Sequence, residues 1–400
     1  MDVRTGLPVV GMVGGGQLAR MTHQAAVALG QSLRVLAATA TDAAALVAPD
    51  VVIGSHQDLT TLRRFAQGCD VLTFDHEHVP TEHLRALVAE GVRVYPGPDA
   101  LRHAQDKLVM RRTLAGLGVP VPPFREVIQP ADAVAFGAEQ GWPCMLKAAR
   151  GGYDGRGLWV LGNPEAGRRV VAELLAAGTP LLVEQCVAMR RELAVLVARS
   201  PFGQGAAWPV VQTVQRDGIC VEVLAPAPRL DAELAQAAQQ LALRIAGELG
   251  VVGVLAVELF ETHAGQLLVN ELAMRPHNSG HWTIDGAVTS QFEQHLRAVL
   301  DYPLGSTAAR APVCVMANVL GAGTPPVMSL DERVHHLMAR YPQAKLHLYA
   351  KPERPGRKIG HVTVFGDEPL PVREVAVASA AFLAAGVWTD GYPVHGQETA

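Results

Sequence analysis

Short apolar runs alternate with helix-patterned stretches along the first hundred residues. Continuous apolar runs predict strands at residues 7–13, 33–38, 71–74 and 92–96. Apolar positions at helical spacing predict helices at residues 17–29, 59–67 and 82–90. Strands that alternate with helices are typical of a parallel sheet. We therefore expect a parallel α/β domain over residues 1–103.

From about residue 104 the pattern changes to paired strands mixed with helices. Apolar runs predict strands at residues 143–149, 158–161, 181–187, 254–260 and 267–273. A chain of 400 residues has room for two or three domains, each with a full core. The expected fold class is α/β and α+β, with a middle domain over residues 104–303 and a small C-terminal β-containing module over residues 304–400.

Composition and charge exclude several classes of protein. Hydrophobic residues make up 49% of the chain and charged residues 18%, as in a well-packed soluble protein. No apolar run has the length of a membrane span and no signal peptide is visible, so we expect a cytoplasmic protein with no membrane partner. The five cysteines lack CxxC spacing, which favours reduced thiols. A net charge of −4 without a basic tract gives no footprint for nucleic acid.

Two glutamates are predicted to face each other on one hairpin. Glu258 and Glu271 lie at equal distances from a turn between Ala264 and Gly265. Opposed residues on an antiparallel pair have Cβ atoms roughly 4.5–5.5 Å apart, and two carboxylates at that separation repel by about 3 kcal/mol at an effective dielectric constant near 20. Mg²⁺ offsets such repulsion and completes its octahedron with waters and phosphate oxygens. The alternative interpretation is a pair of solvated surface glutamates.

Two glycine-rich loops are candidates for phosphate binding. Gly14, Gly16 and Ala19 fit G-x-G-x-x-A between a strand and a helix, which is compatible with a dinucleotide, with a tight structural turn or with another phosphate-bearing substrate. No acidic residue ends the following strand, which disfavours a nicotinamide enzyme. The second loop, RGGYDGRG at residues 150–157, follows Lys147 and fits a flap over a triphosphate rather than a Walker A loop. An ordinary long hairpin is the alternative.

Two acidic residues and one basic loop complete the set of candidates. Glu184 and the main chain after it could pair with an adenine amino edge, and Glu192 could reach ribose hydroxyls, although either could be a surface acid. The loop KPERPGRK, residues 351–358, carries four basic residues and two prolines, which favours a preorganised monophosphate site over a solvated hairpin tip.

These motifs, in this order, resemble the ATP-grasp superfamily. Within it, GGGQLARM, TFDHEHVP, GGYDGRG, QRDGIC, ELAMRPHNSGHWT and KPERPGRKIGHVTV resemble the 5-(carboxyamino)imidazole ribonucleotide synthase family of purine biosynthesis, over about residues 8–370. The resemblance implies an ATP-grasp fold with a pre-ATP-grasp domain at its N-terminus. It also implies a cytoplasmic homodimer whose partners are small molecules.

The activity implied by the resemblance is an ATP-dependent carboxylation. ATP phosphorylates bicarbonate to carboxyphosphate, the exocyclic amine of 5-aminoimidazole ribonucleotide takes the carboxyl group, and ADP and phosphate are released. ATP is then a co-substrate and Mg²⁺, with Mn²⁺ as an alternative, is the metal. Other interpretations are an ATP-grasp ligase with a different amine or acyl substrate and a non-catalytic nucleotide-binding regulator. The paired glutamates argue against the regulator, since a regulator does not need two carboxylates for a metal. No biotin-attachment segment is visible, which disfavours a biotin-dependent carboxylase.

The resemblance assigns the candidate site residues to four groups. The metal ligands are Glu258 and Glu271. The catalytic residues, which would hold bicarbonate and carboxyphosphate oxygens, are Glu77, Arg275, His277 and Asn278. The ATP-binding residues are Lys107, Lys147, Gly152, Tyr153, Asp154, Gly155, Arg156, Gly157, Glu184, Gln185, Val187, Glu192, Gln215, Asn270 and Glu271. The ribonucleotide-binding residues are Gly15, Gly16, Gln17, Leu18, Tyr153, Asp154, Arg156, Lys351, Arg354, Arg357 and Lys358.

The chain departs from the family pattern at a few positions. Met274 stands where the family usually has proline, and we expect this change to alter loop stiffness rather than hydrogen-bond donors. Gln215 stands where histidine is typical, and Gln212 and Thr213 replace Glu-Asn, so that hydrogen-bonding capacity is kept while charge is removed. Capping or core roles are the alternative for His277 and His281.

Overall fold

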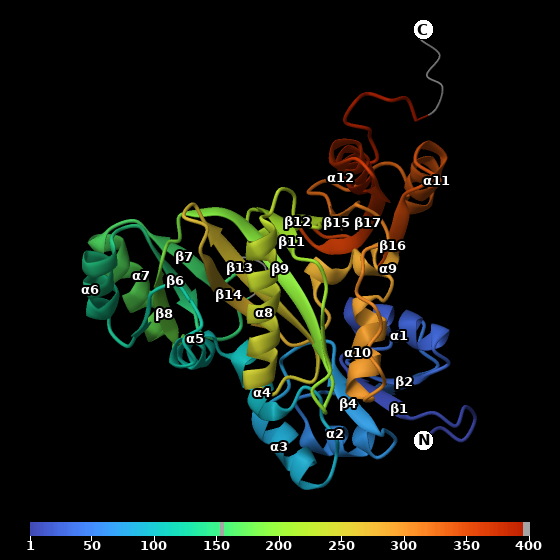
Figure 1. The fold of residues 1–400 in the computed structure, drawn as a ribbon, viewed down its shortest axis with the longest axis horizontal. Helices are drawn as coiled ribbons and strands as arrows, with labels where there is room; N and C mark the ends of the chain where they lie inside the picture. Colours follow the sequence, from blue (N-terminus) through green and yellow to red (C-terminus); the bar gives the residue numbers. More distant parts are fainter. Residues whose placement is uncertain (153–155, 395–400) are drawn as a thin grey trace.

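The computed structural model describes residues 1–152 and 156–394. The N-terminal domain is built on a four-stranded parallel sheet in the order β3-β2-β1-β4. Its elements are β1 (Val9–Val13), α1 (Gln17–Ala28), β2 (Ser32–Ala37), β3 (Asp50–Ile53), α2 (Leu59–Ala66), β4 (Val71–Phe74), α3 (Thr81–Ala89) and α4 (Pro98–Gln105). The predicted parallel α/β fold is therefore confirmed (Figure 1).

Two details of this domain differ from the expectation. The segment predicted as a strand at residues 92–96 contacts β4 only around Leu72, with a single parallel bridge to Val94, so that prediction was wrong. Strand β3 was not predicted, because it lies at the edge of the sheet and none of its four residues is buried, so they do not form a continuous buried run.

A second, antiparallel sheet follows, with the order β5-β8-β6-β7. Its residues 144–148 and 158–161 form adjacent antiparallel strands, as predicted for the two sides of the glycine-rich flap. Helices α6 and α7 pack together and bury their apolar faces with this sheet. The elements are α5 (Lys107–Gly116), β5 (Phe124–Val127), α6 (Pro130–Gln140), β6 (Cys144–Ala148), β7 (Leu158–Leu161), α7 (Pro164–Ala176) and β8 (Leu181–Gln185).

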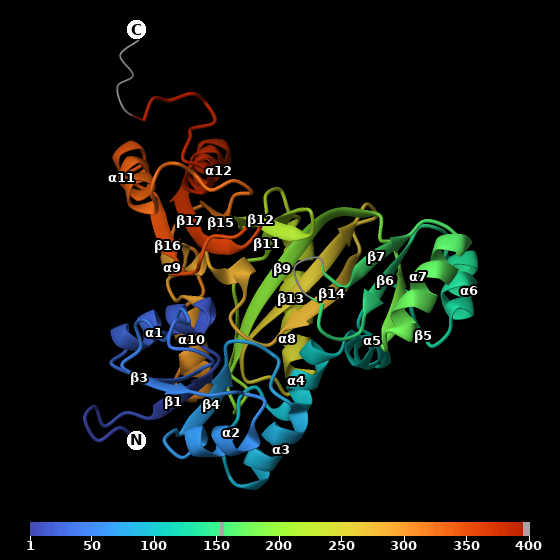
Figure 2. The same ribbon diagram turned by 180° about the vertical axis from the view of Figure 1, so that it is seen from behind.

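A nine-stranded sheet forms the centre of the molecule and continues into the C-terminal module. Its strands follow the order β14-β13-β9-β11-β12-β15-β17-β16, with β10 paired to β9. The elements are β9 (Met189–Arg199), β10 (Gly205–Ala207), β11 (Val211–Arg216), β12 (Ile219–Ala225), α8 (Ala232–Glu248), β13 (Gly253–Thr262), β14 (Leu267–Ala273), η1 (Asn278–Gly280), α9 (Thr283–Gly286), α10 (Gln291–Val299), β15 (Val313–Leu320), α11 (Leu330–Arg340), β16 (Lys345–Leu348), β17 (Lys358–Gly366) and α12 (Pro369–Ala385). Because β12 pairs with β15, the sheet crosses the boundary expected near residue 303 (Figure 2).

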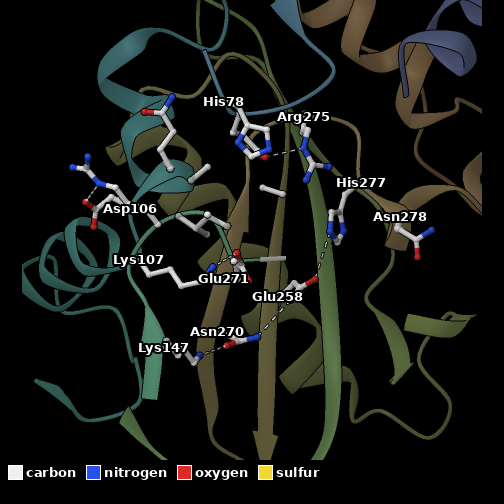
Figure 3. A pocket seen from close by; sticks show the side chains of 18 of the residues that line it. His78, Asp106, Lys107, Lys147, Glu258, Asn270, Glu271, Arg275, His277 and Asn278 are labelled. Carbon is white, nitrogen blue, oxygen red and sulfur yellow. Dashed lines mark hydrogen bonds and ion pairs between the residues drawn. The ribbon is translucent and has the colours of Figure 1, made fainter. Parts of the chain in front are cut away.

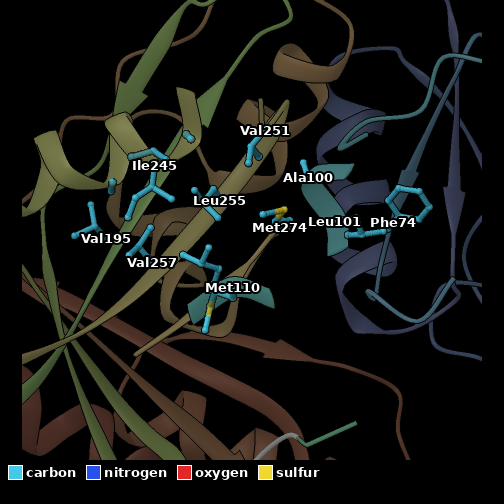
Figure 4. Close-up of a cluster of buried hydrophobic side chains, with 14 of the residues drawn as sticks. Phe74, Ala100, Leu101, Met110, Val195, Ile245, Val251, Leu255, Val257 and Met274 are labelled. Carbon is cyan, nitrogen blue, oxygen red and sulfur yellow. The ribbon is translucent and has the colours of Figure 1, made fainter. Parts of the chain in front are cut away.

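The largest buried apolar cluster joins the N-terminal domain to the central sheet. Phe74 and Leu101 belong to the same cluster as Leu255, Val257 and Met274 (Figure 4). Each fully buried side chain of this kind contributes roughly 1.5–3 kcal/mol. The shared core therefore fixes the orientation of the N-terminal domain relative to the hairpin of β13 and β14.

A buried histidine adds a polar link at the same junction. The backbone N–H of Val254 donates to His295 Nδ1 over 3.0 Å, so the proton of this imidazole lies on Nε2, which is 2.7 Å from Thr73 Oγ1. Burial lowers the pKa of His295 to about 4, which keeps the ring neutral. Helix α10 is thereby bonded to both β4 and β13.

None of the helices in the described ranges combines the length and apolar character that a membrane crossing requires.

Candidate active site

A cleft of about 1200 Å³ lies where the N-terminal domain and the two antiparallel sheets meet. Its walls carry side chains from all three parts of the chain, including many of the predicted site residues (Figure 3). The predicted residues that line it are Gln17, Leu18, Glu77, Lys107, Lys147, Gly152, Glu192, Gln215, Glu258, Asn270, Glu271, Arg275, His277, Asn278 and Lys358.

The two glutamates of the β13–β14 hairpin face each other, as their spacing predicts. The ladder pairs Glu258 with Glu271. Near the turn, however, Leu259 pairs with Val269, a register that by itself would place Glu258 opposite Asn270. A β-bulge at Asn270 absorbs one residue and brings Glu271 into line. Bulges of this kind re-aim side chains next to active sites, and here Asn270 Nδ2 lies 3.5 Å from Glu258 Oε2.

The opposed carboxylates have the electrostatics of a metal site. Burial, reinforced by the charges of Glu271 and Glu192, raises the pKa of Glu258 to about 7. Lys107 Nζ lies 2.5 Å from Glu271 Oε1 and offsets only part of the negative charge. Within residues 1–152 and 156–394, no group of three or more His, Cys, Asp or Glu side chains is placed so that it could hold a metal ion. The donor set fits Mg²⁺, which needs few protein carboxylates when phosphates and waters supply the other ligands.

Lys147 belongs to a buried ionic triad that the sequence did not reveal. Its ammonium lies 2.8 Å from Glu184 Oε2 and donates to Asn270 Oδ1 over 3.2 Å. Arg111, from α5, binds the same Glu184 carboxylate through Nε at 2.6 Å and Nη2 at 3.2 Å, and its Nη1 donates to the carbonyl of Val269 at 3.1 Å. One negative and two positive charges leave the triad with a net charge of +1 beside the cleft.

The triad changes the role that Glu184 can have. Burial acts to raise the pKa of this carboxyl, but Lys147 and Arg111 outweigh it and hold the pKa below its usual value. Because the carboxylate is buried and both of its oxygens accept from cations, it does not line the cleft. Its contact with an adenine amino edge stays a prediction.

The loop after β14 presents nitrogen donors next to the carboxylate pair. Arg275 Nε donates to Glu77 Oε2 over 2.9 Å, which anchors the guanidinium to the N-terminal domain. His277 Nε2 lies 3.5 Å from Glu258 Oε1. Burial, with the nearby charges of Arg275 and Lys358, lowers the pKa of His277 to about 3, so this contact joins a neutral imidazole and a carboxylate rather than two ions. Asn278 exchanges two hydrogen bonds with Asn318, at 2.9 and 2.8 Å.

Met274 contributes a donor, contrary to the expectation from sequence. Its backbone N–H donates to Glu77 Oε1 over 3.1 Å, so Glu77 accepts from two consecutive residues of the loop. A proline at this position has no N–H and could not make the bond. The substitution therefore adds a hydrogen bond between the loop and the N-terminal domain, and the expectation that donors would not change was wrong.

The first glycine loop is engaged by a carboxylate of its own domain. The N–H of Gly16 donates to Asp75, and the N–H of Ala19 lies 3.3 Å from the other carboxylate oxygen. A Cβ at Gly16 would meet Asp75 Oδ2, so the absence of a side chain at this position allows the carboxylate to approach the amide. Gly15 and Gly16 are absent from the described lining of the cleft, whereas Gln17 and Leu18 belong to it. Sequence reasoning missed Asp75, although it lies within the motif TFDHEHVP.

The basic loop divides between the cleft and the surface. Lys358 lines the cleft, and Lys351 donates to the side chain of Gln17 at the start of α1. Arg354 and Arg357 are not part of the lining that the described residues form, and Arg357 Nη1 lies 3.4 Å from the carbonyl of Pro352. Lys351, the loop residue that contacts Gln17 of the N-terminal domain, therefore lies at the end of the cleft that is predicted to bind the ribonucleotide.

The remaining predicted residues are placed away from the lining or cannot be placed. Gln185, Val187, Arg156 and Gly157 do not belong to the cleft surface formed by the described residues. Tyr153, Asp154 and Gly155 lie outside the residues that the structure describes. Their assignments to ATP and to the ribonucleotide stay predictions. Glu192 does line the cleft, and burial raises the pKa of its carboxyl.

Three family models match the chain and together cover most of its length. The model of the ribonucleotide synthetase preATP-grasp domain matches residues 7–105. The model of the ATP-grasp domain matches residues 112–292. The model of the phosphoribosylaminoimidazole carboxylase C-terminal domain matches residues 314–374.

Curated relatives match along almost the entire chain. The chain is 65% identical over 388 residues to the N5-carboxyaminoimidazole ribonucleotide synthase of Mycobacterium tuberculosis H37Rv, a match that covers 97% of this chain and 90% of the relative. It is 50% identical over 396 residues to the protein of the same name from Corynebacterium ammoniagenes, which covers 97% of this chain and 94% of that one.

Solved structures share the fold. N5-carboxyaminoimidazole ribonucleotide synthetase from Thermus thermophilus superposes with a TM-score of 0.82 at 39% identity, over 94% of this chain and 98% of the other. N5-carboxyaminoimidazole synthase from Aspergillus clavatus, solved in complex with ADP and 5-aminoimidazole ribonucleotide, superposes with a TM-score of 0.86 at 32% identity, also over 94% and 98%.

Proposed function

The chain belongs to the N5-carboxyaminoimidazole ribonucleotide synthase family of ATP-grasp enzymes, and on that basis we propose that it carboxylates 5-aminoimidazole ribonucleotide. The reaction consumes ATP and bicarbonate, transfers the carboxyl group to the exocyclic amine and releases ADP and phosphate. It is a step of purine biosynthesis and makes the protein an ATP-dependent carbon–nitrogen ligase.

One observation carries the proposal for this site. Two opposed carboxylates, Glu258 and Glu271, lie between a wall with a net positive charge and a loop of nitrogen donors. Phosphoryl transfer is chiefly a matter of positioning and of neutralising the charge on the phosphates. A triphosphate along the Lys107 and Lys147 wall would place its terminal phosphate beside the carboxylates, where a small oxyanion bound by the loop can reach it.

The metal requirement follows from the carboxylate pair. Glu258 and Glu271 would hold Mg²⁺, and Mn²⁺ suits the same oxygen ligands. When bound, the metal would neutralise phosphate charge and orient the triphosphate. Lys107 lies against Glu271, and Asn270 contacts both Lys147 and Glu258, so these side chains hold the carboxylates in place.

The protein's own groups would orient the oxyanion. Arg275 supplies a fixed positive charge, because Glu77 holds its Nε. His277 and Asn278 contribute uncharged donors, since the lowered pKa of His277 keeps its imidazole neutral. Neutral donors next to Arg275 would bind bicarbonate without adding a further charge beside the metal. Glu77, Arg275, His277 and Asn278 are proposed as the catalytic residues on this argument.

The ribonucleotide is assigned to the end of the cleft next to α1. Gln17 and Leu18 line the cleft there, and Lys351 contacts Gln17. Lys358 lines the same cleft and adds positive charge for a monophosphate. Family membership also supports two further proposals, that the protein acts in the cytoplasm and that it forms a homodimer.

The proposed function is tested by coupled measurement of ADP release. ADP should accumulate only when ATP, Mg²⁺ and bicarbonate are all present, and its rate should increase when 5-aminoimidazole ribonucleotide is added. Mass spectrometry of the nucleotide product should show the added carboxyl group. Binding of ATP without any bicarbonate-dependent ADP release would instead favour a nucleotide-binding regulator.

A further inference from the structure

A buried glutamine clamps the backbone of His277. Gln291 is the first residue of α10 and is fully buried. Its Oε1 accepts from the N–H of His277 over 2.8 Å, and its Nε2 donates to the carbonyl of His277 over 2.8 Å. Since an N–H must meet the oxygen and a carbonyl must meet the nitrogen, these two bonds fix which end of the side-chain amide is which.

A third bond of the same amide determines the proton position on His281. Gln291 Nε2 lies 2.9 Å from His281 Nδ1. An amide nitrogen donates and cannot accept, so Nδ1 must be the unprotonated nitrogen of the ring. Burial, aided by the neighbouring charges, holds the pKa of His281 well below its usual value, so the imidazole is neutral and carries one proton. That proton is therefore on Nε2.

The Nε2–H of His281 is a buried donor with no acceptor among the described residues. The ring is fully buried, yet it belongs to the lining of the cleft. Nδ1 is directed at Gln291, so Nε2 lies on the opposite side of the ring, away from α10. Phe292, Tyr349 and His361 surround the ring, with centroids 5.7, 6.1 and 5.1 Å away, and hold it in this orientation. Buried donors almost always have a partner, and because His281 belongs to the lining of the cleft, we consider a ligand bound there as that partner.

We propose that His281 is a further oxyanion-binding residue, whose Nε2–H donates to an oxygen of the small oxyanion held by Arg275, His277 and Asn278, and that Gln291 is the positioning residue that imposes the tautomer. This inference rests on the proposed function, which assigns bicarbonate to that end of the cleft. His281 would then add a neutral donor to that oxyanion. The alternative partner is a buried water, which would leave catalysis independent of His281.

The chain offers a closely matched control on the same helix. Gln294 is also fully buried, and it makes the same two-point clamp on a backbone, with Nε2 to the carbonyl of Gly305 at 2.9 Å and Oε1 from the N–H of Gly305 at 2.8 Å. Gly305 follows α10 and is not part of the described lining of the cleft. Replacing either glutamine by glutamate makes an equal chemical change in α10, but only Gln291 contacts the oxyanion loop.

The test combines spectroscopy with kinetics of the full-length protein. Imidazole ¹⁵N NMR, with the His281 signal assigned by its loss in His281→Phe, should show the Nε2–H tautomer in the wild type. Gln291→Glu should move the proton to Nδ1, because the new carboxylate accepts. His281→Phe and Gln291→Glu should each raise the KM for bicarbonate by about ten- to a hundred-fold, as expected for the loss of one hydrogen bond to a charged group. The KM for ATP should stay within about two-fold of the wild-type value in both variants. Gln294→Glu should alter neither the tautomer nor the KM for bicarbonate.

Several results would overturn the inference. A wild-type His281 protonated on Nδ1 would refute the tautomer assignment. An unchanged bicarbonate KM in His281→Phe would mean that the acceptor is a buried water. Equal impairment by Gln291→Glu and Gln294→Glu would mean that α10 packing, not the tautomer, is what matters. If the wild type showed no bicarbonate-dependent turnover, the proposed function would fail, and the inference would still be decided by whether bicarbonate shifts the His281 Nε2 resonance.

Discussion

Individual charges in the cleft depend on neighbours that are distant in sequence. Glu258 is crowded by Glu271 and lies in a largely protein environment, so its carboxyl, with its pKa raised to about 7, releases its proton only near neutral pH. Lys147 is buried, and the burial lowers the pKa of its ammonium although Glu184 acts in the opposite direction. The charges of these side chains depend on one another, and a single substitution should therefore alter more than one of them.

The carboxylate pair is expected to be indispensable for turnover but not for folding. Glu271→Gln removes one proposed metal ligand and also relieves the repulsion at Glu258. The lost ion pair with Lys107 is partly exposed, and such pairs contribute about 0–1 kcal/mol. Turnover should be lost, whereas the thermal midpoint without metal should hold or rise. Near-normal turnover in this variant would contradict the metal assignment.

The raised pKa of Glu258 predicts a pH dependence of metal binding. Mg²⁺ binds the ionised carboxylate, so a proton on Glu258 competes with it below about pH 7. The apparent affinity for Mg²⁺ should fall by about ten-fold for each pH unit below that value, where one proton must be displaced. Titration of Mg²⁺-dependent ATP binding between about pH 5.5 and 8, at about half-unit steps, would reveal it. In Glu258→Gln this proton-linked slope should be absent.

The same group should affect stability in the opposite direction. Its pKa in the folded protein is raised above the ordinary 4.5, so the folded state holds the proton more tightly than the unfolded state. The stability that this provides is fully present below about pH 4.5 and is lost as the pH rises through about 7. Urea unfolding of the metal-free protein should show the loss, and Glu258→Gln should reduce it.

Arg111 is expected to act through the charge of the triad. Arg111→Met leaves Lys147 and Glu184 as a neutral pair. We expect the KM for ATP to rise by about ten-fold or more, because about 1.4 kcal/mol of electrostatic attraction between the triad and the phosphates is lost. The free energy of unfolding should also drop, because the buried Glu184 carboxylate loses one of its two cationic partners while it keeps Lys147.

A second substitution separates charge from packing. Glu184→Gln in the Arg111→Met background restores the net charge of +1 without the arginine at pH values where Lys147 keeps its proton, because burial lowers the pKa of that ammonium and Glu184 no longer opposes it. If the triad acts by its charge, this double variant should bind ATP more tightly than Arg111→Met alone, as measured by steady-state KM. ATP binding as weak as in the single variant would assign Arg111 a purely structural role.

At the scale of elements, the hairpin, the loops and the helix starts determine what the cleft contains. The opposition of Glu258 and Glu271 was predicted from their equal distances to the turn, but the register next to the turn pairs Leu259 with Val269, so the opposition depends on the bulge at Asn270. The bulge itself could not be predicted, since one inserted residue leaves no trace in the apolar pattern. Likewise Arg111 resembles any arginine of an amphipathic helix, and its burial depends on meeting Glu184, 73 residues away in the sequence.

The glycine loop shows the same limit. The strand–glycine–helix pattern was compatible with amides that bind a phosphate at the start of α1 and with a tight structural turn, and Asp75 from the end of β4 accepts from two of these amides. Sequence alone could not show this, because the parallel pairing of β1 with β4 is what brings the two segments together. The motifs therefore predicted correctly which segments meet at the cleft. They were less successful in predicting which atoms of those segments face it.

The basic loop provides a test at this scale. Lys351 lies against Gln17 at the proposed ribonucleotide end, so Lys351→Ala should raise the KM for 5-aminoimidazole ribonucleotide by about ten- to a hundred-fold through loss of a charge-assisted contact. The KM for ATP should stay near its wild-type value. Lys345, an exposed lysine on neighbouring β16, is the control, and Lys345→Ala should match the wild type. If Lys351→Ala changed only the KM for ATP, the assignment of Lys351 to the ribonucleotide would be wrong.

At the scale of the whole molecule, the cleft exists because three sheets converge on it. The apolar cluster that contains Phe74 and Met274 fixes the N-terminal domain against the hairpin, and the central sheet carries the C-terminal strands to the same side. A triphosphate, a small oxyanion and a ribonucleotide can therefore be bound by different parts of the chain around one point. We infer that carboxyl transfer at this point passes through an activated bicarbonate.

Oxygen-isotope transfer tests that claim most directly. The protein would be incubated with ATP, Mg²⁺, 5-aminoimidazole ribonucleotide and ¹⁸O-labelled bicarbonate, and the phosphate and nucleotide products analysed by mass spectrometry. Carboxyphosphate formation predicts one ¹⁸O atom in each released phosphate, together with a carboxylated ribonucleotide in equal amount. Released phosphate without ¹⁸O would exclude carboxyphosphate as the intermediate, and ADP formation without a carboxylated product would exclude the proposed carboxylation.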